Sequence, residues 1–217
     1  RKIHADLRKG DLIAKDVFVA TALITTYAKC GALEEAREVL EQMLTRDVIS
    51  WSALISGYAQ NGQGYEALRC FQQMQDAGLR PNSLTYVVVL KACSIVGSLE
   101  IGEDIHAEVR RQGLLQKDVV LGNALVSMYS KIGVMEKARE VFEQLPLRNV
   151  VSWNALLTGY ARKGLGEEVL KCFRQMQKVK VRPDAMTYVS VLKGCGILGS
   201  LEIGEAINDA LRNQRLL

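Results

Sequence analysis

Proline is scarce in this sequence, and so are long apolar segments. Only 3 of the 217 residues are proline, whereas 48% are apolar and 24% are charged. This composition is typical of a helix-rich globular protein with enough apolar surface for a continuous core. No apolar run approaches the roughly 18 to 20 residues that a bilayer-spanning helix requires. The first four residues, Arg-Lys-Ile-His, also lack the hydrophobic region of a signal peptide.

Paired cysteine motifs are missing as well. The five cysteines contain no C-x-x-C pair, and four of them (Cys70, Cys93, Cys172 and Cys195) recur at equivalent places of an internal repeat. Neither a zinc framework nor a disulfide framework is therefore predicted, and a reducing compartment is favoured. The formal net charge of +4 permits a polyanionic partner without requiring one.

The internal repeat has a period of 102 residues. Aligning residues 16–115 with residues 118–217 without a gap gives 54 identical pairs in 100. Each block divides into segments of 31, 35 and 36 residues, which in the first block are 16–46, 47–81 and 82–117. Every segment has an apolar-periodic stretch that ends near a glycine, followed by a second such stretch. The pattern predicts two antiparallel helices per segment.

The segment 47–81 illustrates how these helices are expected to pack. Trp51, Leu54, Ile55 and Tyr58 fall at i, i+3, i+4 and i+7, so they share one face of a helix that ends at Gly62. Neither helix of a pair can bury its apolar stripe alone, so successive pairs must stack. The predicted fold is all-α: an α-solenoid superhelix of stacked antiparallel helix pairs, with the first helix of each pair on the inner surface.

The aromatic residues of the first helices lie on these apolar stripes. We expect them in the core rather than on a stacking platform; they are Trp51, Trp153, Tyr27, Tyr58, Tyr129 and Tyr160.

Three motifs resemble nucleotide-binding, zinc-deaminase or histidine sites, but their sequence context does not support these functions. Gly194, Gly196 and Gly199 spell G-x-G-x-x-G, but a predicted helix precedes them where a dinucleotide-binding fold needs a strand. His106 opens the H-x-E of zinc deaminases, but no P-C-x-x-C follows. His4 and His106 hold equivalent places in second helices, where a packed or solvent-facing imidazole is the usual outcome. With no Ser–His–Asp set or carboxylate pair, we expect no enzyme activity, cofactor or metal site.

Two sequence runs resemble a known repeat. Residues 48–58 (Val-Ile-Ser-Trp-Ser-Ala-Leu-Ile-Ser-Gly-Tyr) and 150–160 (Val-Val-Ser-Trp-Asn-Ala-Leu-Leu-Thr-Gly-Tyr) resemble the first helix of pentatricopeptide repeats. The stretches 66–74 and 168–176, each followed by Arg-Pro, resemble the second helix. A tetratricopeptide repeat would carry Leu-Gly after its Trp, where Ala-Leu occurs here. The lengths 31, 35 and 36 match the short, standard and long repeats of the PLS subclass.

The resemblance implies a single repeat array. Its parts are a partial long repeat (1–15), short repeats (16–46 and 118–148), standard repeats (47–81 and 149–183), a long repeat (82–117) and an incomplete long repeat (184–217). Plant members of the subclass select organellar transcripts, mostly for C-to-U editing. The resemblance therefore implies a parent protein of the chloroplast or mitochondrion.

The same resemblance implies binding of single-stranded RNA, one base per repeat. The family points to a polar residue one turn into each first helix and to the last residue before the next repeat's helix. We call these two positions a reading pair. The four pairs are Thr21 with Asp47, Ser52 with Asn82, Asn123 with Asn149, and Asn154 with Asp184.

The last residue of a pair has a chemical rationale. A carboxylate only accepts hydrogen bonds, so Asp47 and Asp184 suit guanine or uracil, whose ring N–H donates. An amide also donates, so Asn82 and Asn149 suit adenine or cytosine. By resemblance alone, Thr or Ser at the first position implies a purine and Asn implies a pyrimidine.

The predicted core is 5′-GANCU-3′, with C or U at the fourth base. The N lies at the long repeat, where Val87 offers no hydrogen bond, and Val189 repeats that deficiency. The resemblance also implies apolar residues that sandwich the bases, with stacking typically worth about 1 to 3 kcal/mol per base. These residues are Phe18, Ile49, Val120 and Val151.

Basic residues near the ends of first helices suit phosphate contacts. Lys29, Lys131 and Arg162 are the candidates, although solvated charges explain them equally well. The resemblance further implies protein partners for the long repeats, including multiple organellar RNA editing factor (MORF) proteins. Because both ends of the chain interrupt repeats, the sequence fits a segment or an engineered array. Uncapped apolar ends would then favour end-to-end self-association. A protein- or peptide-binding scaffold is the alternative function.

Overall fold

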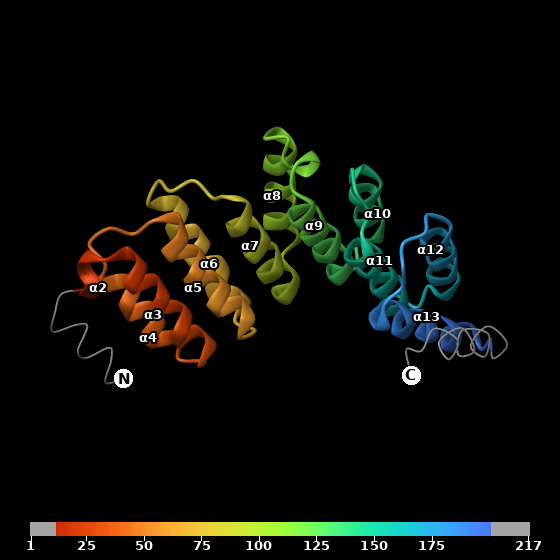
Figure 1. Cartoon of the computed structure of the whole chain (residues 1–217), viewed down its shortest axis with the longest axis horizontal. Helices are drawn as coiled ribbons and strands as arrows, with labels where there is room; N and C mark the ends of the chain where they lie inside the picture. The colour runs from red at the N-terminus through yellow and green to blue at the C-terminus, as the bar shows by residue number, and fades with distance from the viewer. Residues whose placement is uncertain (1–11, 201–217) are drawn as a thin grey trace. The chain divides into compact units, whose positions relative to one another are not determined.

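The computed structural model describes residues 12–200, and every regular element in that range is helical (Figure 1). The chain forms two compact units, Arg1–Val109 and Arg110–Leu217. Within each unit, antiparallel helix pairs stack on one another. This arrangement confirms the all-α solenoid class expected from the apolar periodicity.

The described part of the first unit contains three first helices, α3 (Val17–Lys29), α5 (Val48–Gln60) and α7 (Ser83–Val96). Its other elements are α2 (Leu12–Lys15), α4 (Leu33–Gln42), α6 (Gly64–Asp76) and α8 (Leu99–Arg111), which runs two residues past the unit boundary. α3 pairs with α4 and α5 pairs with α6. α5 also packs against both α3 and α7, so the first helices form a continuous layer.

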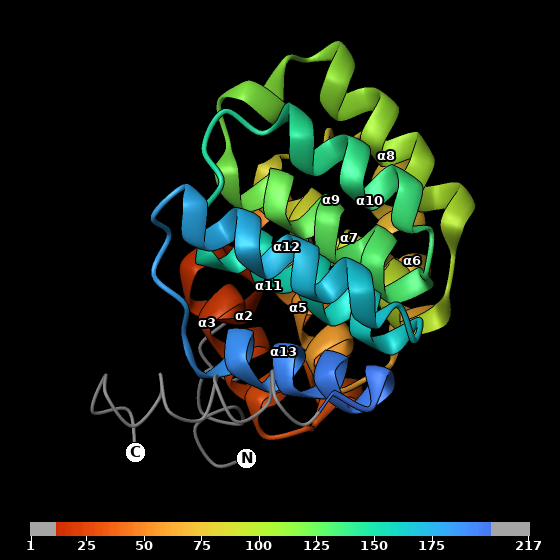
Figure 2. The ribbon, with the colours of Figure 1, turned by 90° about the vertical axis from the view of Figure 1, so that its right-hand side faces the viewer.

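The second unit repeats the plan. Its elements are η1 (Leu114–Gln116), α9 (Val119–Ile132), α10 (Met135–Gln144), α11 (Val150–Arg162), α12 (Gly166–Lys178) and α13 (Ala185–Leu198). α11 lies between α9 and α13, and α12 packs against both α11 and α13 (Figure 2).

The apolar stripe of α5 is buried as predicted. Leu54, Ile55 and Tyr58 are fully buried and Trp51 is 7% exposed. Of the six aromatic residues expected in the core, only Tyr27 is half-buried rather than buried. Gly62 follows α5 with φ of +77°, the left-handed conformation that favours glycine after a helix.

Close approach between neighbouring first helices depends on one glycine in each unit. A Cβ atom at Gly57 of α5 would lie 2.6 Å from the Cβ of Ala28 on α3. At the equivalent Gly159 of α11, a Cβ would lie 2.8 Å from the Cβ of Ser130 on α9. The glycine backbone of one first helix therefore lies against a Cβ atom of the neighbouring first helix, which brings the two helices close together.

An arginine ends each short repeat and leads into the next first helix. Arg46 donates to the carbonyls of Leu40 and Glu41 at 2.8 Å each, and these carbonyls lie at the open end of α4. Arg148 does the same for α10, at 3.1 and 2.6 Å. The next residue in each case, Asp47 or Asn149, is the N-cap of a first helix, so the arginine helps to place that helix.

Candidate functional site

The last residue of every reading pair caps a first helix. Asp47, Asn82, Asn149 and Asp184 are the N-caps of α5, α7, α11 and α13. Each side-chain oxygen accepts the backbone N–H of the helix's third residue, at 2.8, 2.9, 3.1 and 2.9 Å respectively. An Asp or Asn ahead of a helical pattern is a signal for such a cap.

The cap decides which polar atom remains for a ligand. A backbone N–H requires an acceptor, so a capping Asn must use its oxygen and retains its NH₂ group, a donor. A capping Asp retains acceptor capacity, because an ionised carboxylate has about four lone-pair sites. The donor-or-acceptor difference expected between Asn and Asp therefore follows from the local fold.

In the second unit, the two members of each reading pair are in direct contact. The Asn123 amide donates from Nδ2 to Oδ1 of Asn149 at 3.2 Å. The Asn154 amide donates from Nδ2 to Oδ1 of Asp184 at 2.9 Å. Asn123 is 8% exposed, and its own Oδ1 is buried without a hydrogen-bond partner.

In the first unit, the members of a pair do not bond directly. The hydroxyl of Ser52 lies 2.8 Å from that of Thr85, which in turn donates to Oδ1 of Asn82 at 2.9 Å. Thr21 and Asp47 are both described, and no hydrogen bond joins their side chains; Oγ1 of Thr21 is buried without a partner. Thr85, and its equivalent Thr187, were not anticipated from the sequence.

Asp184 is electrostatically adapted to stay ionised. Partial burial alone would raise the pKa of this carboxyl. Hydrogen bonds from the Thr187 backbone, the Asn154 amide and the Thr187 hydroxyl oppose that effect, and the net result is a pKa below the ordinary aspartate value. At neutral pH the group is therefore a stable acceptor.

The residues expected to sandwich bases are apolar yet exposed. Each is the second residue of a first helix, and the exposed fractions of Phe18, Ile49, Val120 and Val151 are 88%, 49%, 64% and 56%. The long repeats have the same feature, because the second residues of α7 and α13, Leu84 and Met186, are each 55% exposed. The equivalence of repeat positions would have predicted these last two.

A groove of about 260 Å³ brings several predicted site residues of the first unit together. It is lined by α3, α5 and α7 and includes Thr21, Lys29, Ile49 and Ser52. Leu84 also lines it. This surface, the first-helix groove, combines hydroxyl groups, exposed apolar side chains and one ammonium group on neighbouring first helices.

The three basic candidates are all exposed. Lys29 and Arg162 are the last residues of α3 and α11, and Lys131 lies in the last turn of α9. A cation near the carboxyl end of a helix is favoured by the helix dipole even without a ligand. Their exposure suits a phosphate contact, but these positions also have this purely structural explanation.

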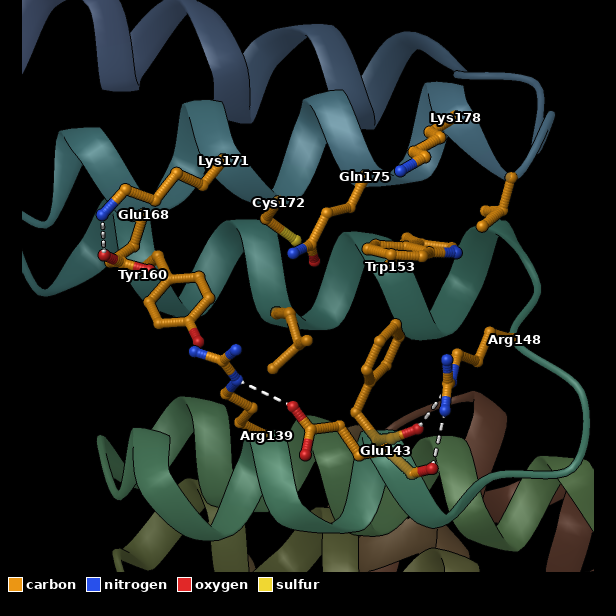
Figure 3. A pocket seen from close by; sticks show the side chains of 13 residues that line it. Arg139, Glu143, Arg148, Trp153, Tyr160, Glu168, Lys171, Cys172, Gln175 and Lys178 are labelled. Atoms are coloured by element: carbon orange, nitrogen blue, oxygen red, sulfur yellow. Dashed lines mark hydrogen bonds and ion pairs between the residues drawn. The ribbon is translucent and has the colours of Figure 1, made fainter.

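A larger cavity, of about 660 Å³, lies elsewhere in the second unit (Figure 3). It is lined by α10, α11 and α12 and contains none of the predicted site residues. Four of its charged groups form two ion pairs: Arg139 contacts Glu143 at 2.9 Å, and Lys171 contacts Glu168 at 2.8 Å. A similar hollow of about 310 Å³ occurs at the equivalent place in the first unit. Each is lined by a ten-residue second helix, α10 or α4, and by a thirteen-residue one, α12 or α6.

The motifs set aside from the sequence have structural roles. Gly194 and Gly196 lie within α13, and Gly199 caps it with φ of +63°. His106 is buried in α8, whereas His4 lies outside the described residues. Within residues 12–200, no group of three or more His, Cys, Asp or Glu side chains is placed to hold a metal ion. No helix in the same range has the length and apolar character needed to cross a bilayer.

Comparison with solved structures shows the same fold. The structure of the pentatricopeptide repeat protein PPR10 from maize superposes with a TM-score of 0.70 at 24% identity, covering 89% of this chain and 29% of that one. PPR10 in complex with an 18-nucleotide psaJ RNA element gives a TM-score of 0.75 at 19% identity, covering 97% and 32%.

Curated relatives extend the likeness to sequence. A chloroplastic pentatricopeptide repeat-containing protein of Arabidopsis thaliana is 37% identical over 217 residues, which cover all of this chain and 35% of the relative. A mitochondrial one from the same plant is 38% identical over 204 residues, covering 94% and 32%. The chain thus spans about a third of the length of these relatives.

Family models complete the comparison. The model described as the PPR repeat family matches residues 46–94 and 148–196, and the model described as PPR repeat matches 18–48 and 123–150. These matches cover most of the chain and include all four reading pairs. The chain therefore belongs to the pentatricopeptide repeat family.

Proposed function

We propose that this chain is a sequence-selective single-stranded RNA-binding module that recognises one base per reading pair, with the core 5′-GANCU-3′. The observation that carries the proposal is the groove of the first unit, where Thr21 and Ser52 lie beside the exposed Ile49 and the ammonium group of Lys29. Hydrogen-bonding groups, an apolar surface and a cation are the three components that base recognition, stacking and phosphate neutralisation require. PPR10, a relative in fold, is crystallised with an RNA element.

The contacts within the pairs also support the expected preference for base size. Asn123 and Asn154 extend directly to the last residue of their pairs. The hydroxyl of Ser52, a residue that is 2% exposed, is instead hydrogen-bonded to that of Thr85. The longer amide occupies space beside the last residue that a hydroxyl leaves open. A purine would use that space in the first unit, and only a pyrimidine would fit in the second.

The arrangement of repeats supports a more specific role. Lengths of 31, 35 and 36 residues suggest the PLS subclass, and we propose that the parent protein selects chloroplast or mitochondrial transcripts for C-to-U editing. One relative is named as chloroplastic and another as mitochondrial. Within this role, the long repeats would bind MORF proteins. The reaction itself would belong to another region or another protein, because no P-C-x-x-C follows the H-x-E of this sequence.

Fluorescence anisotropy tests the proposal directly. We expect tighter binding to an unstructured oligonucleotide that contains GANCU than to a scrambled one of equal composition. If Lys29, Lys131 and Arg162 each neutralise a phosphate, the log–log dependence of affinity on salt has a slope of roughly 2. Replacing all three by Ala should remove most of that slope, whereas Lys171→Ala on α12 should not. Equal affinity for the two oligonucleotides would refute base recognition.

The scaffold alternative predicts a different outcome. A peptide-binding solenoid would form protein complexes that survive ribonuclease and would show no salt-dependent affinity for RNA. Selection of bound RNA from a random pool would then yield no motif, whereas the proposed function predicts enrichment of GANCU in this polarity.

A further inference from the structure

The third residue of a first helix differs between the two kinds of junction. At the start of each standard repeat it is serine, and the hydroxyls of Ser50 and Ser152 donate to the backbone carbonyls of Asp47 and Asn149, at 2.9 and 2.8 Å. At the start of each long repeat it is threonine, and the hydroxyl reaches side chains instead. All four residues are fully buried. The contrast occurs in both compact units.

In the second unit, the threonine fixes the orientation of an amide. The single hydroxyl proton of Thr187 is shared between two acceptors, Oδ1 of Asn154 at 2.6 Å and Oδ1 of Asp184 at 3.0 Å. With its oxygen held by this donor, Asn154 must direct its NH₂ group at Asp184, to which it donates at 2.9 Å. An NH₂ group has two N–H bonds, so one remains available to a base.

In the first unit, the equivalent threonine fixes the direction of two hydroxyls. Thr85 has a single hydroxyl proton, which it donates to Oδ1 of Asn82, an atom that can only accept. The hydroxyl of Ser52 must therefore donate to Thr85 across their 2.8 Å contact. Asn82 is then left with its NH₂ group free of the cap, and Ser52 is left with lone pairs.

We propose that Thr85 and Thr187 are positioning residues that set base selectivity at the second and fifth bases of the core. The proposal rests on the proposed RNA binding. Each hydroxyl holds one reading pair in a single arrangement of donors and acceptors, and the pair then presents a fixed pattern to its base. The pairs at the start of the standard repeats, Thr21 with Asp47 and Asn123 with Asn149, have no such third member.

Valine replacements test the proposal, because valine has the shape of threonine without the hydroxyl. Thr187→Val should lower the preference for U over C at the fifth base by roughly tenfold. Without the hydroxyl, the orientation of the Asn154 amide is no longer fixed, and the charged Asp184 loses about one hydrogen bond. The preference for A over G at the second base should not change. Thr85→Val should lower the preference for A over G at the second base and leave the preference at the fifth base unchanged. Anisotropy with the four oligonucleotides that vary these two bases measures both ratios.

Two further variants separate positioning from stability. Thr187→Ser keeps the hydroxyl and should retain the preference for U over C. Ser152→Ala removes a buried hydroxyl at the matching place of α11, and should lower the midpoint of thermal unfolding without altering any base preference. A wild-type preference that survives in both valine variants would overturn the proposal. So would a general loss of affinity that leaves both ratios intact.

The failure of the proposed function would look different. Wild-type protein would then fail to discriminate at either base, before any variant is measured. Circular dichroism shows whether each valine variant has folded. Because the two threonines lie in separate compact units, a folding failure of one variant leaves the other available to test the effect on base preference.

Discussion

The two compact units share a backbone plan but differ in how their reading pairs are joined. In the second unit, Asn123 and Asn154 bond directly to the last residue of their pairs. In the first unit, Ser52 is joined to Asn82 only through Thr85, and Thr21 is not joined to Asp47. The buried residues that hold the helices together are largely the same. Under the proposed function, a change at the fifth residue of a first helix would therefore alter base selectivity without altering the packing beneath it.

Exchanging the last residues of equivalent pairs is the most direct test of whether the two units differ in base preference. Asn82→Asp should move preference at the second base from A to G, and Asp184→Asn should move it at the fifth base from U to C. Both substitutions keep an N-cap, so the fold is retained. Because a mismatched buried donor or acceptor costs about 1 to 3 kcal/mol, each ratio should shift by roughly ten- to hundredfold. Anisotropy with single-base variants of the RNA measures the shift.

Asp118 provides the control for this exchange. It caps α9 by accepting the Leu121 N–H at 3.0 Å, but it follows a long repeat whose first reading position is a valine. Asp118→Asn should therefore leave all base preferences unchanged. A preference that stays at A in Asn82→Asp would break the assignment of that pair.

A second comparison concerns the glycines at the contacts between neighbouring first helices. In Gly57→Ala the new Cβ meets the Cβ of Ala28 at 2.6 Å, and this atom cannot move without its backbone. In Gly159→Ala part of the crowding falls on the flexible side chain of Met135. We expect destabilisation of about 2 kcal/mol in the first unit and about 1 kcal/mol in the second, measured by urea unfolding.

Gly196 is the matched control for these substitutions. It lies within α13, and a Cβ there would meet nothing within 4 Å. Gly196→Ala should stabilise the protein by up to about 1 kcal/mol through helix propensity. Equal destabilisation by all three alanines would contradict the packing argument.

The pH response should also distinguish the units. The pKa of Asp184 lies below the ordinary aspartate value, so its stabilising hydrogen bonds are complete above the unfolded-state pKa and are lost as pH falls through the lowered one. Asn82, the equivalent residue of the first unit, does not titrate. Carboxyl carbon NMR should show Asp184 titrating below the usual range. In Thr187→Val its pKa should rise, and a pKa at or above the ordinary value in the wild type would contradict this account.

The smallest expected difference is in thiol reactivity. Burial raises the pKa of Cys70 to about 11, and that of Cys93 and Cys172 to about 12. Cys30 is exposed, and the equivalent residue of the second block is Ile132. A disulfide reagent at pH 8 should therefore modify one thiol rapidly, because the thiolate is the reactive form. Cys30→Ser should abolish this fast phase, whereas a persistent fast phase would show that a buried thiol is accessible.

The sequence predicts the fold well because the fold depends on two periodic patterns, the apolar spacing within each helix and the 102-residue repeat. The apolar spacing of Trp51, Leu54, Ile55 and Tyr58 defines one helix face, and Gly62 marks its end. The 102-residue repeat requires every such element to occur twice. These signals are local or repeated, so no knowledge of distant contacts is needed to recognise them.

The candidate site is less accessible to sequence analysis. The side-chain bridges made by Thr85 and Thr187 depend on which rotamer a buried hydroxyl adopts, and no periodicity reveals that. Serine at the same place turns to its own backbone instead. The arginine caps at Arg46 and Arg148 depend on an irregular loop whose course is not encoded by spacing. Leu84 and Met186 are different, since their alignment with Ile49 and Val151 in the repeat is sufficient to predict their exposure.

One consequence of the N-caps extends to how such arrays diversify. The residue that caps each first helix is Asp or Asn, and its side-chain oxygen accepts a backbone N–H. These side chains have two terminal atoms, so capping and ligand contact can fall on different atoms, whereas a serine or threonine hydroxyl would use one oxygen for both. Under the proposed function, exchanging Asn and Asp at this position changes the group offered to a base and keeps the helix cap.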